Sequence, residues 1–295
     1  MTQLFSGKDV SESVYESLIP KIESLRSHGV VPGLAAILVG EDPASRVYVR
    51  SKARRFELLN LFTETIRLDA GISQDKLVAK IRSINTDGRF HGTLVQLPLP
   101  KNIDDNEIIN MVNPMKDVDG FHPENVGFLT IGNPRFIPCT PKGIMRILSY
   151  YDVELLGKHV VIIGRSNIVG RPISILTSLK KSFSNATTTI CHSGTEDIRY
   201  FTKQADIIIA AMGVPNILDK SYIKPGVILI DVGINRVDDD SEKGYKLVGD
   251  IDRKSVTDIA NGLTPVPGGV GPMTIAMLVE NTVEAAALQS GIVLD

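Results

Sequence analysis

The sequence predicts an α/β protein of two domains, the second a Rossmann-type doubly wound parallel sheet, with a cleft between them. The chain has 295 residues, a length that suits two domains of ordinary size. Short apolar runs alternate with stretches of helical periodicity, which is typical of βαβ units and a mostly parallel sheet. The alternation stops at residues 117–141, which are rich in Gly, Pro and Asn, and then restarts. That interruption indicates a domain junction.

The composition is that of a globular protein that acts on a small molecule. Hydrophobic residues make up 43% and charged residues 22%, which excludes a disordered or collagen-like chain. The 32 Lys and Arg nearly balance the 34 Asp and Glu, so neither nucleic acid nor an anionic membrane is expected as a partner. No run reaches the roughly 20 apolar residues of a membrane span. The first residues do not resemble a signal peptide. We therefore expect a cytoplasmic protein.

No metal site is expected from the cysteines and histidines. Cys139 and Cys191 are far apart in sequence and neither belongs to a C-x-x-C pair. Reduced thiols are therefore favoured over a disulfide or a metal site. The five histidines show no H-x-x-x-H or H-E-x-x-H spacing.

The first predicted domain, residues 1–120, begins with alternating helices and strands. Residues 9–29 carry apolar side chains at a spacing near 3.6, which predicts an amphipathic helix, and residues 33–40 form a wholly apolar run between glycines, which predicts a buried parallel strand. The same patterns predict further helices at residues 43–60 and 73–86 and strands at residues 62–68 and 91–100, the last ended by a Pro-x-Pro stop.

The second predicted domain, residues 121–272, contains four nearly uncharged strands, as expected for the centre of a doubly wound sheet. Residues 234–250 are polar and predict a hairpin or arm. A final helix is expected at about residues 273–288. The strands are predicted at residues 159–164, 186–191, 205–213 and 226–233.

The segment from Val160 to Pro172 is a candidate dinucleotide site. It reads as a strand, a glycine turn and a helix start, a geometry that aims backbone N–H groups at a pyrophosphate. It departs from G-x-G-x-x-G because Ser166 replaces the second glycine and Gly170 comes four residues later. An ordinary βα turn is the alternative.

The cofactor preference follows from the end of the next strand. NAD-binding folds place a carboxylate there, but this strand ends in Cys-His-Ser-Gly at residues 191–194. Arg165 lies in the adjacent turn, and a guanidinium suits a 2′-phosphate, so NADP is favoured over NAD. The alternatives are that Arg165 is a solvated surface charge and that Ser193 caps the following helix.

Tyr48 and Lys52 are candidate reacting groups. Their i, i+4 spacing places both on one face of a helix, where a lysine near a phenol can transfer protons. The alternative is an exposed charged face, because Arg46, Arg50 and Arg54 lie on the same helix. Y-x-x-x-K is also typical of short-chain dehydrogenases, but there it follows the glycine loop, whereas here it precedes Gly164.

Three further segments are candidates for binding a ligand. Gln96 lies at the carboxyl end of a predicted strand, where α/β sheets bind ligands; the alternative is a polar strand end. Asp117 and Asp119 lie in the predicted junction and are candidates for a ligand cleft or for Asx turns. Gly268 and Gly269 belong to a glycine-rich loop whose backbone can approach a ligand closely.

Taken together, these segments closely resemble the bifunctional methylenetetrahydrofolate dehydrogenase/methenyltetrahydrofolate cyclohydrolase family. They occur in the family's order and span nearly the whole chain. VQLPLP and PVPGGVGPMT are the most specific strings. The matching segments are YVRSK (48–52), VQLPLP (95–100), KDVDGFHP (116–123), PCTPKG (138–143), GRSNIVGRP (164–172), DVGIN (231–235) and TPVPGGVGPMT (264–274).

The resemblance implies NADP-dependent oxidation of 5,10-methylenetetrahydrofolate to the methenyl cation, and then its hydrolysis to 10-formyltetrahydrofolate. It makes Lys52 the catalytic lysine, with Gln96 positioning it, Tyr48 contacting the folate and Asp119 binding the pterin. Those four are the expected catalytic residues. Tyr48, Gln96 and Asp119, with Gly268 and Gly269, are expected to bind substrate. The expected NADP contacts are Gly164, Arg165, Ser166, Ser193 and Ile234.

The resemblance also implies that the helix in 273–295 packs on the first domain and that the second domain forms a homodimer. Two other functions stay open at this point. One is an NADP-dependent dehydrogenase of another small substrate, such as an amino or hydroxy acid. The other is a non-catalytic NADP-binding or regulatory protein.

Overall fold

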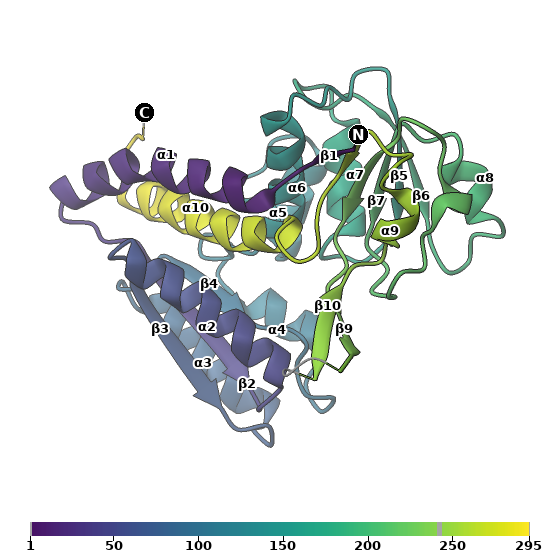
Figure 1. Cartoon of the computed structure of the whole chain (residues 1–295). Coiled ribbons are helices and arrows are strands. Elements are labelled where there is room, and N and C mark those ends of the chain that lie inside the picture. The colour runs from purple at the N-terminus through teal and green to yellow at the C-terminus, as the bar shows by residue number, and fades with distance from the viewer. Residues whose placement is uncertain (1, 241–243, 295) are drawn as a thin grey trace. The chain divides into compact units, whose positions relative to one another are not determined.

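The computed structural model describes residues 2–240 and 244–294, which form two compact units (Figure 1). Residues 14–139 and 275–295 make up what we call the three-stranded unit, and residues 1–13 and 140–274 make up the six-stranded unit. Two long helices, α1 (Gly7–Ser27) and α10 (Val270–Ser290), begin in the six-stranded unit and end in the three-stranded unit.

The three-stranded unit contains a parallel sheet with the order β3-β2-β4. All seven residues of the central strand β2 are buried, as expected for a strand covered on both faces. Its other helices are α2 (Pro43–Leu58), α3 (Gln74–Thr86), α4 (Asp105–Met111) and α5 (Pro123–Thr130). The strands are β2 (Gly33–Val39), β3 (Phe62–Leu68) and β4 (Gly92–Val95).

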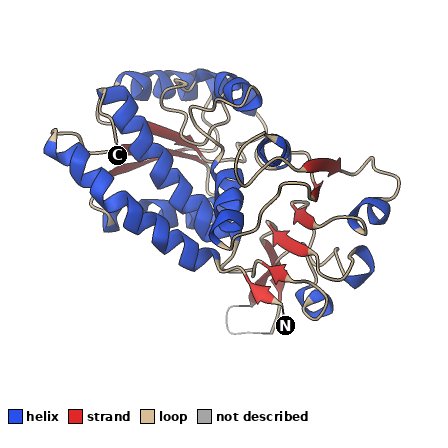
Figure 2. Ribbon diagram, turned by 90° about the horizontal axis from the view of Figure 1, so that it is seen from above, coloured by secondary structure: helices blue, strands red, loops and turns tan. Residues whose placement is uncertain are grey.

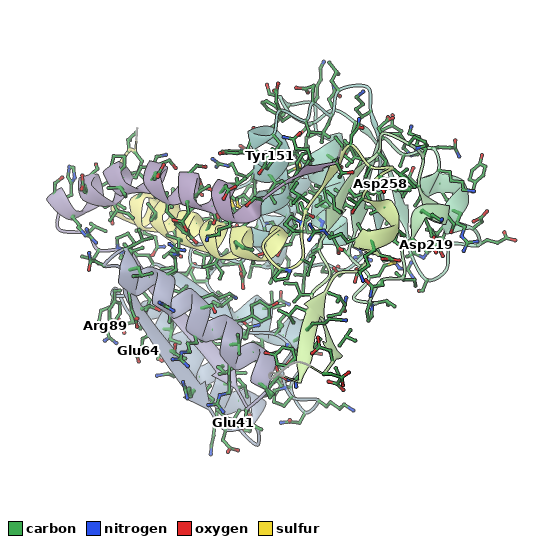
Figure 3. The ribbon with its side chains drawn as sticks, in the orientation of Figure 1. Glu41, Glu64, Arg89, Tyr151, Asp219 and Asp258 are labelled. Carbon is green, nitrogen blue, oxygen red and sulfur yellow. The ribbon has the colours of Figure 1, made fainter. Side chains whose placement is uncertain are left out.

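An apolar core fixes α3 on this sheet. Leu77, Ile81 and Ile84 lie on one face of α3 and are buried against Ala35 and Ile37 of β2. The outer side of the unit is polar. Arg89 and Glu64, labelled in Figure 3, lie 3.8 Å apart, and Arg89 also pairs with Asp87 at 2.7 Å.

The six-stranded unit contains a parallel sheet with the order β1-β11-β8-β7-β5-β6, whose strands are red in Figure 2 near the N-terminus. The chain runs from β5 outward to β6 and then returns to β7 on the other side of β5. This reversal is the topological switch point, where doubly wound sheets bind ligands. The strands are β1 (Gln3–Leu4), β5 (His159–Ile163), β6 (Thr187–Cys191), β7 (Ile207–Ala210), β8 (Ile228–Asp231) and β11 (Gly262–Leu263).

Helices and a hairpin complete the six-stranded unit. The antiparallel hairpin of β9 (Asn235–Asp238) and β10 (Tyr245–Val248) confirms the polar arm predicted at 234–250, of which residues 241–243 lie outside the described residues. The remaining helices are α6 (Cys139–Tyr150), α7 (Gly170–Ser178), α8 (Ile198–Thr202), the 3₁₀ turn η1 (Lys220–Tyr222) and α9 (Arg253–Val256). In the part of the chain that the structure describes, no helix is long and apolar enough to cross a membrane.

The predicted fold class, α/β with a doubly wound second sheet, is confirmed, and the differences are local. The strand predicted at 91–100 ends at Val95. The segment 117–141 includes α5, which Pro123 and the side chain of His122 begin; this helix has only eight residues and no clear apolar period. β1 and β11 have two residues each, too few for a sequence pattern. The assignment of folate binding to residues 1–120 and of NADP binding to residues 121–272 stays a prediction.

Candidate active site

Lys52 lies at the centre of a polar cluster in the three-stranded unit. Helix α2, begun by Pro43 and by Asp42 accepting the Ser45 N–H, carries Lys52 on its inner face, where only 7% of the residue is exposed. Its Nζ donates to Oε1 of Gln96 at 3.1 Å. A lysine removed from water with an amide acceptor holds its amine in a defined direction, which the sequence pattern alone left open.

Gln96 is fixed from its other side. It follows β4, and its backbone N–H donates to the carbonyl of Ile37 on β2 at 2.9 Å. Its side-chain Nε2 donates to the carbonyl of Leu97 at 2.8 Å. Because Nε2 is engaged there, Oε1 is the atom that faces Lys52. Gln96 is therefore more than a polar strand end.

Tyr48 lies one helical turn before Lys52, as the i, i+4 spacing predicts. The residue is 37% exposed. Burial of its ring raises the pKa of the phenol, so Tyr48 is a neutral hydrogen-bond group at physiological pH. A half-buried aromatic ring with a polar tip suits contact with a flat heterocycle.

The segment 117–120 divides its two carboxylates between two roles. Asp117 accepts the N–H groups of Phe121 and His122 and the side-chain amide of Asn125 at 2.8 Å. Gly120, with φ of +73°, completes the turn that follows. Asp117 thus anchors the backbone before α5 and does not form an Asx turn, in which its side chain would bond the N–H two residues on.

Asp119 is half-buried and has a perturbed acidity. Burial raises the pKa of its carboxyl to about 6, and the positive charge of Lys52 partly opposes this rise. The nearby Asp117 raises the pKa further, and a hydrogen bond from Cys139 lowers it. Asp119 is thus an acceptor that is mostly ionised at pH 7 and within the electrostatic influence of Lys52.

Residues that the sequence analysis missed hold this segment in place. Asn281 of α10, which is fully buried, donates to the carbonyls of Val118 at 2.7 Å and Ile137 at 3.0 Å. Beside β4, the N–H of Thr93 donates to the carbonyl of Lys116 at 2.7 Å. The cluster Glu280-Asn281-Thr282 within the mostly apolar final helix was the available signal.

The turn after β5 forms a narrow backbone cradle at the carboxyl edge of the six-stranded sheet. Gly164 has φ of +126°, and a Cβ there would lie 2.3 Å from the carbonyl oxygen of Ala211. A Cβ on Gly170 would lie 2.2 Å from the carbonyl oxygen of Gly164. Ser166 Oγ accepts the Val169 N–H at 3.1 Å, which stabilises the turn into α7. Glycine is therefore required at both positions.

Arg165 and Ser193 lie at the ends of adjacent strands. β5 and β6 pair with Ile163 opposite Cys191, so the residues that follow them share one edge. Arg165 is exposed, and its Nη1 lies 3.3 Å from Nε2 of His192. Ser193 is exposed as well; α8 is capped by Asp197, so the alternative that Ser193 caps this helix is wrong.

The remaining predicted residues also belong to the six-stranded unit. Ile234 follows β8 and is 41% exposed. Gly268 has φ of +104°, and its carbonyl accepts the Lys8 N–H at 3.2 Å. A Cβ on Gly269 would lie 2.5 Å from the carbonyl of Pro265, so part of the need for glycine comes from the fold of this loop. Within residues 2–240 and 244–294 there is no group of three His, Cys, Asp or Glu that could hold a metal ion.

Comparison with known families matches both parts of the chain. Residues 5–119 match the catalytic domain of tetrahydrofolate dehydrogenase/cyclohydrolase, and residues 138–290 match its NAD(P)-binding domain. The chain belongs to this family. The bifunctional protein FolD of Chlorobium chlorochromatii is 50% identical to it, over 98% of this chain and 99% of that protein.

Solved structures of the family have the same fold. The bifunctional FolD enzyme of Campylobacter jejuni is 46% identical with a TM-score of 0.92, over 98% of this chain and all of that one. The methylenetetrahydrofolate dehydrogenase-cyclohydrolase of Trypanosoma brucei is 34% identical with a TM-score of 0.93, over 98% of both chains. That enzyme was solved with NADP and an inhibitor.

Proposed function

We propose that this chain oxidises 5,10-methylenetetrahydrofolate to 5,10-methenyltetrahydrofolate with NADP⁺ and then hydrolyses the product to 10-formyltetrahydrofolate. The observation that carries the proposal is the Lys52–Gln96 hydrogen bond of 3.1 Å, with Lys52 acting electrostatically on Asp119. Family membership over both domains supports the same two activities. This combination disfavours a dehydrogenase of an amino or hydroxy acid and a non-catalytic NADP-binding protein.

Asp119 and Tyr48 recognise the folate. The carboxylate of Asp119 accepts hydrogen bonds from the amino group and the ring N–H of the pterin. Desolvation strengthens such bonds, because the half-buried carboxylate has few competing waters. Tyr48 contacts the folate ring with its aromatic face, and the backbone of Gly268 and Gly269 contributes further contacts.

Lys52 moves the protons of the hydrolysis. Water adds to the cationic methenyl carbon and loses a proton, which leaves a neutral carbinolamine. The bond from this carbon to N5 then breaks as N5 takes up a proton and the hydroxyl loses its own to form the formyl group, so one proton is released overall. In its neutral form the amine held by Gln96 can accept the first proton, and as the ammonium it can give one to N5. Gln96 fixes the direction of the amine without adding a charge of its own.

The six-stranded unit binds NADP at the carboxyl edge of its sheet. When bound, NADP⁺ supplies the hydride acceptor for the oxidation. Gly164 and Ser166 contact the dinucleotide at the β5–α7 turn, and Ile234 packs against it. Arg165 and Ser193 bind the 2′-phosphate; residues 191–194 at the end of β6 include no carboxylate that would repel it. The chain acts as a cytoplasmic homodimer formed through the NADP-binding domain.

One assay tests the proposed function directly. The purified protein is mixed with 5,10-methylenetetrahydrofolate and NADP⁺, and NADPH and methenyl absorbance are followed together. We expect NADPH to form and the methenyl product to be consumed. Absence of turnover in a folded sample would refute the proposal, and NADPH formation with persistent methenyl product would refute the hydrolase half.

Lys52→Met tests the proton-transfer role. We expect this variant to lose cyclohydrolase activity by at least about 100-fold, the size of a general acid–base contribution, while it still binds NADP. Arg54→Met is the matched control, because Arg54 is exposed on the same helix. Retained hydrolysis in Lys52→Met would exclude Lys52 from this role.

Arg165→Ala tests the cofactor preference. Removal of the guanidinium should weaken NADP binding about tenfold or more and leave NAD binding nearly unchanged, because only NADP carries the 2′-phosphate. Arg199→Ala is the control, since Arg199 stacks on Tyr222 in the same unit. Equal losses for both cofactors would contradict a 2′-phosphate contact.

A further inference from the structure

A buried carboxylate, Asp250, lies beside the proposed NADP site and has no part in the function described so far. It follows β10 and is fully buried. Its Oδ2 accepts the N–H groups of Met212 at 2.6 Å and Gly213 at 3.0 Å, and its Oδ1 accepts the N–H of Val214 at 3.0 Å. One side chain thus organises three consecutive backbone amides.

The same carboxylate also holds the start of the hairpin. Oδ1 of Asp250 accepts the side-chain amide of Asn235 at 3.0 Å. Asn235 directly follows Ile234, one of the proposed NADP contacts. Asp250 therefore links the loop after β7 to the segment after β8, two neighbouring strands of the sheet.

The loop after β7 is in turn close to the glycine cradle. The Ala211 N–H donates to the carbonyl of Ile163 at 2.9 Å, and the Ala211 carbonyl is the atom that leaves no room for a Cβ on Gly164. A shift of Met212 moves Ala211, its neighbour in the chain, and so alters the space around Gly164. The contacts of Asp250 thus extend to the neighbours of two proposed NADP contacts, Gly164 and Ile234.

Asp250 is itself held rigidly. Its backbone N–H donates to Oδ1 of Asp231 at 2.9 Å, and the N–H of Ile251 donates to Oδ2 of Asp231 at 3.0 Å. Gly233 approaches so closely that a Cβ there would lie 2.2 Å from Oδ1 of Asp250. The two oxygens of this carboxylate accept four hydrogen bonds. In an amide, one of these oxygens is replaced by an NH₂ group, which would face N–H donors and could not accept their hydrogen bonds.

We propose that Asp250 is a positioning residue of the NADP site: without touching the cofactor, it sets the geometry of residues 211–214 and of Ile234 and thereby the affinity for NADP. The inference rests on the proposed function, in which the six-stranded unit binds NADP. It adds a residue outside the β5–α7 turn to the determinants of cofactor binding.

Asp250→Asn is the test, with three measurements on the full chain. NADPH affinity is measured by fluorescence titration, kcat and KM for NADP⁺ by the dehydrogenase assay, and cyclohydrolase activity with methenyltetrahydrofolate in the absence of NADP. We expect the Kd for NADPH and the KM for NADP⁺ to rise at least tenfold, with cyclohydrolase activity within twofold of wild type. A purely structural role would lower both activities together, which would overturn the proposal.

Asp206→Asn is the matched control. Asp206 also accepts a backbone N–H, that of His159 at 2.8 Å, but it lies at the amino ends of β5 and β7, the opposite edge of the sheet. We expect its Kd for NADPH within twofold of wild type. If Asp250→Asn does not fold, Asn235→Ala decides, because it removes one of the four bonds; a threefold rise in Kd is expected.

The outcomes separate the two hypotheses. Wild-type protein that fails to bind NADPH refutes the proposed function and this inference with it. If the wild-type protein binds NADPH but Asp250→Asn has an unchanged Kd, the positioning role alone is refuted. If Asp250→Asn does not fold, an unchanged Kd in Asn235→Ala has the same meaning.

Discussion

Asparagine in place of Asp119 is expected to stabilise the three-stranded unit at neutral pH while it impairs folate binding. The carboxyl of Asp119 has its pKa raised from 3.8 to about 6, chiefly by burial. A raised carboxyl pKa means that the folded state binds the proton more tightly than the unfolded state. The ionised Asp119 therefore lowers folding stability at high pH, and this cost disappears as the pH falls from 6 to below 3.8.

The size of the effect follows from the same two values. At 1.36 kcal/mol per pKa unit, ionised Asp119 costs about 3 kcal/mol of unfolding free energy above pH 6, and about half of that at pH 5. For a unit of this size, 3 kcal/mol corresponds to a rise of roughly 6–12 °C in melting temperature. Asparagine has no charge to desolvate, so the Asp119→Asn variant should be more stable than wild type by this amount at pH 8. Most of this difference should disappear at low pH, where Asp119 of the wild type is protonated.

Urea unfolding of wild type and Asp119→Asn at pH 8 and pH 5, followed by circular dichroism, measures the difference. Comparing the two pH values cancels any pH-independent change in hydrogen bonding. Asp87→Asn is the control, because the hydrogen bond from Arg89 holds the pKa of the Asp87 carboxyl at about 2. Asp87 is therefore ionised at both pH values, and the stability of this variant relative to wild type should be the same at pH 8 and pH 5. An Asp119→Asn variant whose stability relative to wild type is the same at both pH values would refute the assigned pKa and its cause.

Two further substitutions test residues that support the two proposed binding sites. Lys116→Met should lower the unfolding free energy, measured by urea unfolding, by about 1–3 kcal/mol. The reason is that the buried Nζ donates to the carbonyls of Ile84 and Asp87 at 3.0 and 2.9 Å. An unchanged urea midpoint would show that these two hydrogen bonds do not stabilise the fold. Gly164→Ala should weaken NADPH binding more than tenfold, measured by fluorescence titration, because its Cβ would meet the carbonyl of Ala211 at 2.3 Å; normal binding would show that the turn can widen.

Local sequence patterns were sufficient to predict the structure where the chain forms regular strands and helices. The apolar runs at 159–164 and 226–233 predicted β5 and β8, since a strand buried on both faces has no polar alternation. The i, i+4 spacing of Tyr48 and Lys52 predicted their common helix face. The polar segment 234–250 predicted the hairpin.

Local sequence patterns were insufficient to predict the role of a side chain whose hydrogen-bond partner lies far away in the sequence. Asp117 and Asp119 lie two positions apart in sequence, and burial raises the pKa of both carboxyls. Asp117 nevertheless accepts the side-chain amide of Asn125, whereas the charge of Lys52 acts on Asp119. Asn281 and Asp250 were not identified, because each acts on backbone groups far away in the chain. The first residues join the six-stranded sheet through β1, a pairing too short for any sequence signal.

By itself the sequence determined the fold class, the alternation of strands and helices, and the residues that distinguish this family. Those features depend on periodicity, on glycine at forced turns and on residue chemistry, all of which are local. Only the tertiary structure decided the hydrogen bond from Lys52 to Gln96, the acidity of Asp119 and the four-bond contact of Asp250. Burial and hydrogen-bond geometry are properties of neighbours in space, and the chain acquires them only when it folds.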